Sequence, residues 1–327
     1  MFTTYIGSFP LSFSQENVRR VIDDVVNIGI DYPNYPQLRD FIEQFLEPHL
    51  MAGSLIKEEG QFRLRRVIDA KVDHSVSLTE ARMTLEYARK KNYMEKVRGW
   101  RACVTGPFTL SSQIYVREGS GLEATAITDH EIVKTLAEYV GEVAKSMVRM
   151  GYTYICIDEP ILGLIVGKRV IFYGYKVEEI VEILSTIFKR LEAKTRSIHV
   201  CGRVSPLLVE TLASLPLEVL DHEFAGSPAN LEIISREVLE RYDKMLAFGC
   251  ISTKRLKVEE LNDVVRLILK AIERYGYERI FVVKPDCGFR GLRGLTTEEE
   301  AYKASIEKLR VLKRAASEVE ARLGHRA

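Results

Sequence analysis

The sequence has 327 residues, of which 46% are hydrophobic and 28% are charged, so it can bury a substantial core and is neither disordered nor fibrous. Its 47 basic residues nearly cancel its 46 acidic ones, which excludes the strongly basic surface that nucleic acid or anionic lipid would select. No stretch has the pattern of a membrane span or a signal peptide, so we expect a soluble cytoplasmic protein.

Short β-rich runs alternate with helical patterns along the chain, which is typical of a parallel sheet with crossover helices. The predicted strands are residues 3–7, 101–105, 153–158, 197–201, 219–223, 247–252 and 279–284, with a less regular one near 28–32. An apolar period of 3.6 residues predicts helices at 14–28, 177–194, 258–275 and 297–323. A further helix is predicted to open at a capping box of Thr128 and Glu131 and to end at Gly151.

Eight such units favour a (β/α)8 TIM barrel within the α/β class, and no G-x-G-x-x-G follows a strand to suggest a doubly wound sheet. Residues 47–100 are densely charged and lack this alternation, so we expect a helical elaboration between two barrel strands. No linker long enough to separate domains occurs, and the sequence therefore predicts a single domain over residues 1–327 with helical insertions.

Four potential metal ligands fall at or just beyond the ends of predicted strands. His199 and Cys201 are two residues apart in a strand and so point to the same face. Glu223 ends the next strand, and Cys287 follows the last one. In a barrel all four reach the rim where active sites are built, and this donor set suits zinc. The spacing alone leaves open the alternative of a buried His–Cys pair, with Cys287 as a small hydrophobic residue after a strand and Glu223 as a salt-bridged rim residue.

The other three cysteines, Cys103, Cys156 and Cys250, lie inside predicted strands, and we expect them to be reduced packing residues.

Five motifs occur in an order and with separations typical of one enzyme family. They are Thr3-Thr4-Tyr5-Ile6-Gly7-Ser8-Phe9-Pro10, Thr105-Gly106-Pro107-Phe108-Thr109, Cys156-Ile157-Asp158-Glu159-Pro160, His199-Val200-Cys201 and Lys284-Pro285-Asp286-Cys287-Gly288. Through them the sequence resembles the catalytic C-terminal half of cobalamin-independent methionine synthase over nearly its whole length, without that family's N-terminal barrel. The resemblance implies a (β/α)8 fold and a methyltransferase that methylates homocysteine, or a related small thiol, to methionine or another thioether.

The resemblance also implies the site residues. Zinc would be held by a four-ligand set, and the acceptor amino acid by the backbone of an Ile-Gly-Ser turn and by an aspartate that pairs with its ammonium group. The implied ligands are His199, Cys201, Glu223 and Cys287, and the implied acceptor-binding residues are Ile6, Gly7, Ser8 and Asp158. Because four protein ligands fill a tetrahedron, we expect Glu223, the hardest donor, to move when a thiol arrives.

The sequence departs from the family at four functional positions. Gln61 replaces a glutamate that would contact the ammonium group, Gln113 a tryptophan that would stack on folate, and Leu164 a folate-contacting glutamate. Lys254 stands where the family has a proton-donating histidine, and it is our candidate catalytic residue. These departures favour a non-folate methyl donor, for example a methylcorrinoid that is free or bound to a carrier protein.

Two other functions remain open at this point. The chain could be another barrel enzyme of the group that includes corrinoid-linked methyltransferases and uroporphyrinogen decarboxylases, although a decarboxylase does not need the four ligands. It could also be a non-catalytic, zinc-stabilised subunit that binds a methyl carrier.

Overall fold

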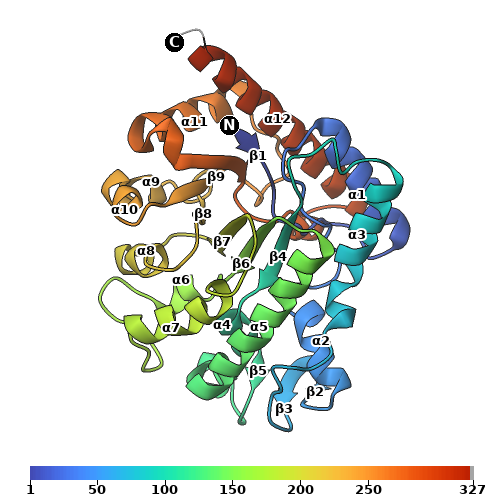
Figure 1. Cartoon of the computed structure of the whole chain (residues 1–327), viewed down its shortest axis with the longest axis vertical. Helices are drawn as coiled ribbons and strands as arrows, with labels where there is room; N and C mark the ends of the chain where they lie inside the picture. The colour runs from blue at the N-terminus through green and yellow to red at the C-terminus, as the bar shows by residue number, and fades with distance from the viewer. Residues whose placement is uncertain (325–327) are drawn as a thin grey trace.

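The computed structural model describes residues 1–324, and its centre is a curled, parallel sheet of seven strands. The strands follow the order β1-β10-β9-β8-β7-β6-β4 (Figure 1). Their bounds are β1 (Phe2–Thr3), β4 (Arg101–Thr105), β6 (Tyr154–Asp158), β7 (Thr195–Val200), β8 (Val219–Glu223), β9 (Met245–Ile251) and β10 (Ile280–Pro285). Each coincides with a predicted strand to within a few residues.

An irregular segment, residues 32–37, occupies the position between the two edge strands. Isolated parallel bridges join Thr4 to Tyr32 on the β1 side and Asn34 to Arg101 on the β4 side. The prediction of a strand near 28–32 is wrong at its start, because Gly29 with φ 83° ends helix α1 there. Two prolines in the segment lack an N–H donor and prevent a regular ladder. The expected (β/α)8 barrel is confirmed, with this irregular eighth member.

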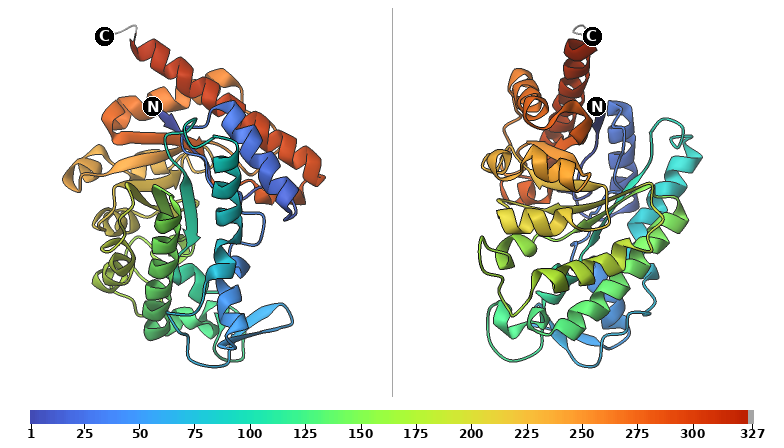
Figure 2. Two further views of the ribbon diagram at one scale, coloured as in Figure 1. Left: turned by 45° about the vertical axis from the view of Figure 1, so that its right-hand side comes forward. Right: turned by 60° about the vertical axis from the view of Figure 1, so that its left-hand side comes forward.

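Helices cover the outside of the sheet, and α12 lies beside α1 and α11 (Figure 2). The long ones are α1 (Gln15–Ile28), α3 (Thr79–Lys90), α5 (His130–Met150), α7 (Val177–Phe188), α11 (Leu261–Tyr275) and α12 (Glu298–Gly324). Shorter ones are α2 (Glu43–Met51), α4 (Pro107–Ser111), α6 (Leu162–Ile165), α8 (Pro206–Ala213), α9 (Asn230–Ile233) and α10 (Arg236–Arg241). Their apolar faces join one core cluster that extends from Tyr5 to Val319. None of the helices in residues 1–324 has the length and apolar character to traverse a bilayer.

The start of α5 differs from the prediction by one residue. Its N-cap is Asp129, whose carboxylate accepts hydrogen bonds from the backbone N–H groups of Glu131 and Ile132. Thr128 instead ends a 3-10 turn and donates its hydroxyl to the carbonyl of Thr125, so the capping box is not formed. The C-terminal end at Gly151, with φ 118°, is as predicted.

The elaboration at residues 47–100 contains helix α3 but also a β-hairpin, so the expected helical elaboration is only partly helical. Strands β2 (Leu55–Glu58) and β3 (Gln61–Leu64) pair antiparallel, and β3 pairs parallel with β5 (Ile114–Tyr115). The turn consists of Glu59 and Gly60, both with positive φ, as tight hairpin turns require. The sequence signal for this turn is Gly60 within a charged run, which the expectation of a helical elaboration did not use.

Candidate metal and acceptor site

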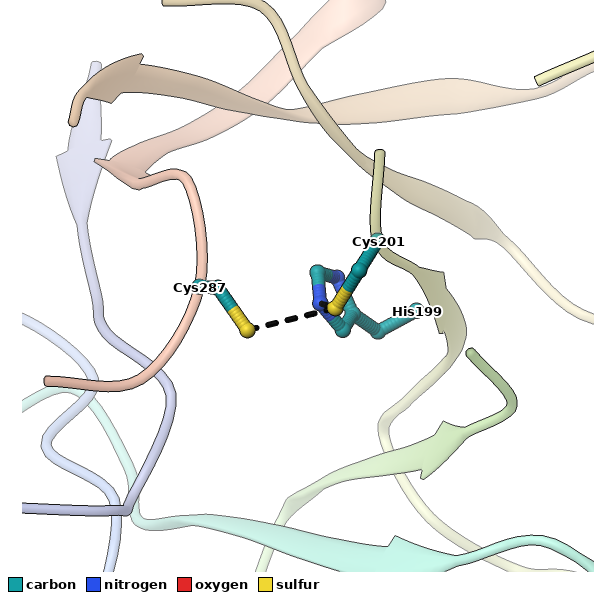
Figure 3. A group of neighbouring side chains, drawn as sticks. All are labelled: His199, Cys201 and Cys287. Carbon is teal, nitrogen blue, oxygen red and sulfur yellow. Dashed lines mark hydrogen bonds between the residues drawn. The ribbon is translucent and has the colours of Figure 1, made fainter. Parts of the chain in front are cut away.

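Three of the four predicted metal ligands meet at the carboxyl ends of the strands. His199 is in β7, Cys201 follows β7 directly, and Cys287 lies two residues beyond β10 (Figure 3). His199 Nε2 is 2.9 Å from Cys201 Sγ, which is 3.2 Å from Cys287 Sγ. Their ligand atoms all lie within 4.8 Å of one another, so the group could hold a metal ion. One imidazole and two sulfur atoms suit a borderline-soft cation such as Zn2+.

A buried aspartate orients the histidine. Asp221 Oδ1 lies 2.7 Å from His199 Nδ1, so this nitrogen donates to the carboxylate and Nε2 faces the two thiols. The same carboxylate contacts Lys284 Nζ at 2.8 Å and Arg101 Nη2 at 2.7 Å. All three charged side chains of this ionic cluster, Arg101, Asp221 and Lys284, are completely buried.

Mutual attraction keeps the groups of this network ionised. Burial opposes the charge on Asp221, but Lys284, His199 and Arg101 hold the pKa of its carboxyl well below the usual range. Burial likewise favours neutral His199, yet the Asp221 carboxylate outweighs it and raises the pKa of the imidazole to about 10. The hydrogen bond from Cys201, followed by the nearby His199, lowers the pKa of the Cys287 thiol despite its burial. The same hydrogen bond raises the pKa of Cys201 well above its usual value, so without a metal the pair favours one thiolate, at Cys287, the form that binds metals.

The fourth predicted ligand, Glu223, is held apart from this group. Its carboxylate receives a hydrogen bond from Lys254 Nζ at 3.0 Å, and its side chain is only 2% exposed whereas that of Lys254 is 63% exposed. Burial would raise the pKa of Glu223, but Lys254 prevails and lowers it. The hydrogen bond to Glu223 in turn raises the pKa of Lys254, which makes the ammonium a weaker acid.

The predicted Ile-Gly-Ser turn packs against the loop that carries Cys287. A Cβ on Gly288 would lie 1.8 Å from Ser8 Oγ, and one on Gly7 would lie 2.6 Å from the carbonyl oxygen of Tyr35. The backbone carbonyl of Ser8 accepts from Phe289 N–H at 2.8 Å. These close approaches explain why both motifs contain glycine, and they fix the turn beside the sulfur ligands.

Asp158 ends β6 and pairs in register with His199 on β7. Burial raises the pKa of its carboxyl well above the usual value. Its neighbours include Cys103 and Cys156, and the two sulfur atoms and a carboxylate oxygen lie within 4.8 Å of one another. Ile6 packs against the same two cysteines. The predicted acceptor-binding residues Ile6 and Asp158 therefore surround one place inside the barrel mouth.

The next residue, Glu159, serves structure. Its buried carboxylate accepts from Phe108 N–H at 2.8 Å and from Thr109 N–H at 2.9 Å, which ties the Thr-Gly-Pro segment to β6. A Cβ on Gly106 would lie 2.3 Å from this carboxylate, so the two motifs depend on each other.

Three of the positions that depart from the family lie together. Gln61, Gln113 and Leu164 line a pocket of about 600 Å³ between the β2–β3 hairpin and the loops after β4 and β6. Leu164 is 69% exposed there. Three of the four departures from the family therefore change the lining of one pocket.

Sequence reasoning missed Asp221, Lys284 and Arg101. The signal was a single charged residue in each of the strands β4 and β10, Arg101 and Lys284, together with the position of Asp221 two residues before Glu223. A charge in a strand that is buried on both faces requires a partner, but the sequence does not identify it.

Comparisons with known proteins agree with this architecture. The sequence profile of the family described as cobalamin-independent synthase, catalytic domain, matches residues 52–317. A methionine synthase of Methanothermobacter marburgensis is 27% identical over 97% of this chain and 100% of its own length. A 5-methyltetrahydropteroyltriglutamate–homocysteine methyltransferase of Burkholderia thailandensis is 25% identical over 88% of this chain, which covers 40% of that protein.

A solved structure of a B12-independent methionine synthase from Shewanella sp. W3-18-1, in complex with selenomethionine, has the same fold. It superposes with a TM-score of 0.69 over 98% of each chain, at 16% identity. The family match covers most of the chain and includes the residues that meet at the rim. The chain therefore belongs to the cobalamin-independent methionine synthase family and is a methyltransferase.

Proposed function

We propose that the chain methylates the thiol of homocysteine, or of a closely related amino acid, at a zinc centre formed by His199, Cys201 and Cys287 with Glu223 as an exchangeable fourth ligand. The observation that carries the proposal is the convergence of three ligand atoms within 4.8 Å at the barrel rim. The donor set fits Zn2+, and Asp221 orients the imidazole as a metal-bound histidine requires. Zn2+ would keep an incoming thiol deprotonated and therefore nucleophilic.

Lys254 has a positioning role in this proposal, in place of the proton donation that its position in the family implies. It holds the Glu223 carboxylate at 3.0 Å, away from the three other ligands. A thiol substrate needs an open position at the metal. Lys254 stabilises the displaced carboxylate and so keeps that position available, and its raised pKa makes it a poor acid for the reaction.

The acceptor amino acid is expected to bind beside the metal ligands. The Asp158 carboxylate, whose Oδ1 is buried without a hydrogen-bond partner among the described residues, would pair with the ammonium group. The backbone of Ile6, Gly7 and Ser8 would contact the rest of the amino acid, because this turn is fixed against the loop that carries Cys287.

The methyl donor is proposed to be a methylcorrinoid, free or on a carrier protein, instead of a methyl-folate. Support comes from the pocket that Gln61, Gln113 and Leu164 line. At the two folate positions, 113 and 164, the pocket presents an amide and an aliphatic side chain where the family has a tryptophan and a glutamate, although Phe41, Phe62, Tyr115, Asp40 and Glu43 also line it. A methyl group on cobalt also needs no protonation of its leaving group, which agrees with the absence of the family's histidine at position 254.

A donor assay tests this choice. The zinc-reconstituted protein is incubated with homocysteine and either methylcobalamin or methyl-tetrahydrofolate of defined glutamate length, and methionine is measured. We expect methionine from methylcobalamin only. A Gln113→Trp/Leu164→Glu variant, which restores two family residues, is the matched comparison. Methionine from methyl-folate alone with the unaltered protein would refute the proposed donor.

A separate experiment tests the metal centre without reference to the donor. X-ray absorption at the zinc edge is compared before and after addition of homocysteine, and we expect one additional sulfur neighbour. Serine, which lacks the thiol, is the control amino acid. An unchanged coordination shell with every thiol would refute thiol activation and favour the carrier-binding subunit.

A further inference from the structure

Two cysteines outside the proposed zinc centre form a second group with Asp158. Cys103 on β4 and Cys156 on β6 are register partners on adjacent parallel strands, and both side chains are completely buried. Asp158 is two residues after Cys156, so its side chain points to the same face. Both sulfur atoms and a carboxylate oxygen lie within 4.8 Å of one another. We propose that Cys103, Cys156 and Asp158 form a second binding site, selective for a thiophilic cation such as Zn2+, Cd2+ or Cu+.

The strand geometry favours a bridging cation over a disulfide. Neighbouring strands lie about 4.8 Å apart, and side chains stand roughly perpendicular to the sheet, so register partners keep about this separation at Cβ. A disulfide needs a Cβ–Cβ distance of about 3.8 Å. Two metal–sulfur bonds of about 2.3 Å at a tetrahedral angle span about 3.8 Å between the sulfur atoms, without moving the strands. Both cysteines are free thiols in the structure.

The surroundings of the two thiols supply charge and a further oxygen donor. Asn34 Nδ2 donates to Cys103 Sγ at 2.9 Å, while Asn34 Oδ1 is buried without a hydrogen-bond partner among the described residues. Arg101, two residues before Cys103 on β4, places a buried positive charge on the same side of the strand. Metal binding to two thiols releases their protons, so occupation of the site depends on pH.

Occupation of this site has a consequence for the acceptor. Asp158 cannot both bind a cation and pair with the substrate ammonium group, so the bound cation should compete with homocysteine. This consequence rests on the proposed function of Asp158, whereas the existence of the site does not.

Cd2+ is the probe, because its thiolate complexes absorb in the ultraviolet and report sulfur ligation directly. The full chain is reduced, stripped of metal and titrated. The unaltered protein should bind two equivalents, and a Cys201→Ser/Cys287→Ser variant should retain one, with its cadmium–thiolate absorption. In this background, Cys103→Ser should abolish that absorption, and Asp158→Asn should weaken binding at least about 10-fold. Cys250→Ser, which alters a buried cysteine elsewhere, should have no effect.

The outcomes separate this site from the proposed zinc centre. Two outcomes would show that the second site does not exist. In one, Cys201→Ser/Cys287→Ser binds no Cd2+. In the other, Cd2+ binding to this variant survives the loss of Cys103 and is unchanged by Asp158→Asn. Circular dichroism of each variant establishes that the barrel is folded, and the Asp158→Asn result decides the matter should Cys103→Ser not fold. One equivalent that depends on Cys103 but not on Cys201 would instead leave this site standing and overturn the zinc centre.

Discussion

Replacing Asp221 by Asn should destabilise the protein by about 3–5 kcal/mol, the cost of breaking a buried ion pair by removing one partner. The structure gives the reason for a value in this range. Asp221 is the only carboxylate within 4 Å of either buried cation in residues 1–324, at 2.7 Å from Arg101 and 2.8 Å from Lys284. Lys284 Nζ keeps two backbone carbonyl acceptors, at 2.9 Å and 2.7 Å. Arg101 keeps only the face of Tyr154, 4.8 Å from its guanidinium carbon, so most of the loss falls on Arg101.

The same substitution should weaken metal binding. An asparagine can accept one hydrogen bond from His199 Nδ1 but provides no negative charge, and loss of such a partner costs about 10- to 100-fold in metal affinity. Equilibrium unfolding in urea, on protein stripped of metal, measures the first effect, and a chelator competition for Zn2+ measures the second.

Asp243→Asn is the matched control. This exposed aspartate pairs with Arg279 at 2.8 Å, and its side chain is 93% exposed, so the same chemical change should cost no more than about 1 kcal/mol. The ionic cluster neither stabilises the barrel nor orients His199 if two results are found together. The free energy of unfolding of Asp221→Asn would lie within about 1 kcal/mol of that of the control, and its affinity for Zn2+ would equal that of the unaltered protein.

Three further changes have defined outcomes. Lys254→Met should raise Co2+ affinity about 10-fold, because Glu223 becomes free to bind the metal, whereas the neighbouring Arg255→Met should not change it. Equal Co2+ affinities of the Lys254→Met variant and the unaltered protein would contradict the holding role of Lys254. Gly288→Ala should abolish homocysteine-dependent changes in the Co2+ spectrum, because its Cβ would lie 1.8 Å from Ser8 Oγ. Adding Ser8→Ala to this variant should restore part of these changes. Unaltered spectral changes in the single variant would show that the Ile-Gly-Ser turn and the Cys287 loop are not in close contact. Burial lowers the pKa of His49 from 6.5 to about 4, so its contribution to stability is complete above pH 6.5 and is lost as the pH falls towards 4, by about 3 kcal/mol. In His49→Gln, the urea midpoint of unfolding should therefore depend less on pH over this range. The same pH dependence in the variant as in the unaltered protein would refute the assignment.

The sequence by itself determined the alternation of strands and helices. The 3.6-residue apolar period and the β-rich runs are local properties, and both persist in the structure, as β8 (Val219–Glu223) and α12 (Glu298–Gly324) illustrate. Parallel strands also bring their carboxyl ends to one rim, which is why His199, Cys201 and Cys287 could be predicted to meet. The family motifs then indicated the chemistry of these residues.

The tertiary structure alone decided which charges pair across the barrel. Arg101 and Asp221 are 120 residues apart, and their contact depends on the register of all the strands between them. The neighbours of Cys103 and Cys156 and the pairing of Glu223 with Lys254 follow from the same cause. A sequence pattern records which face a residue occupies, whereas closure of the barrel determines what that face meets.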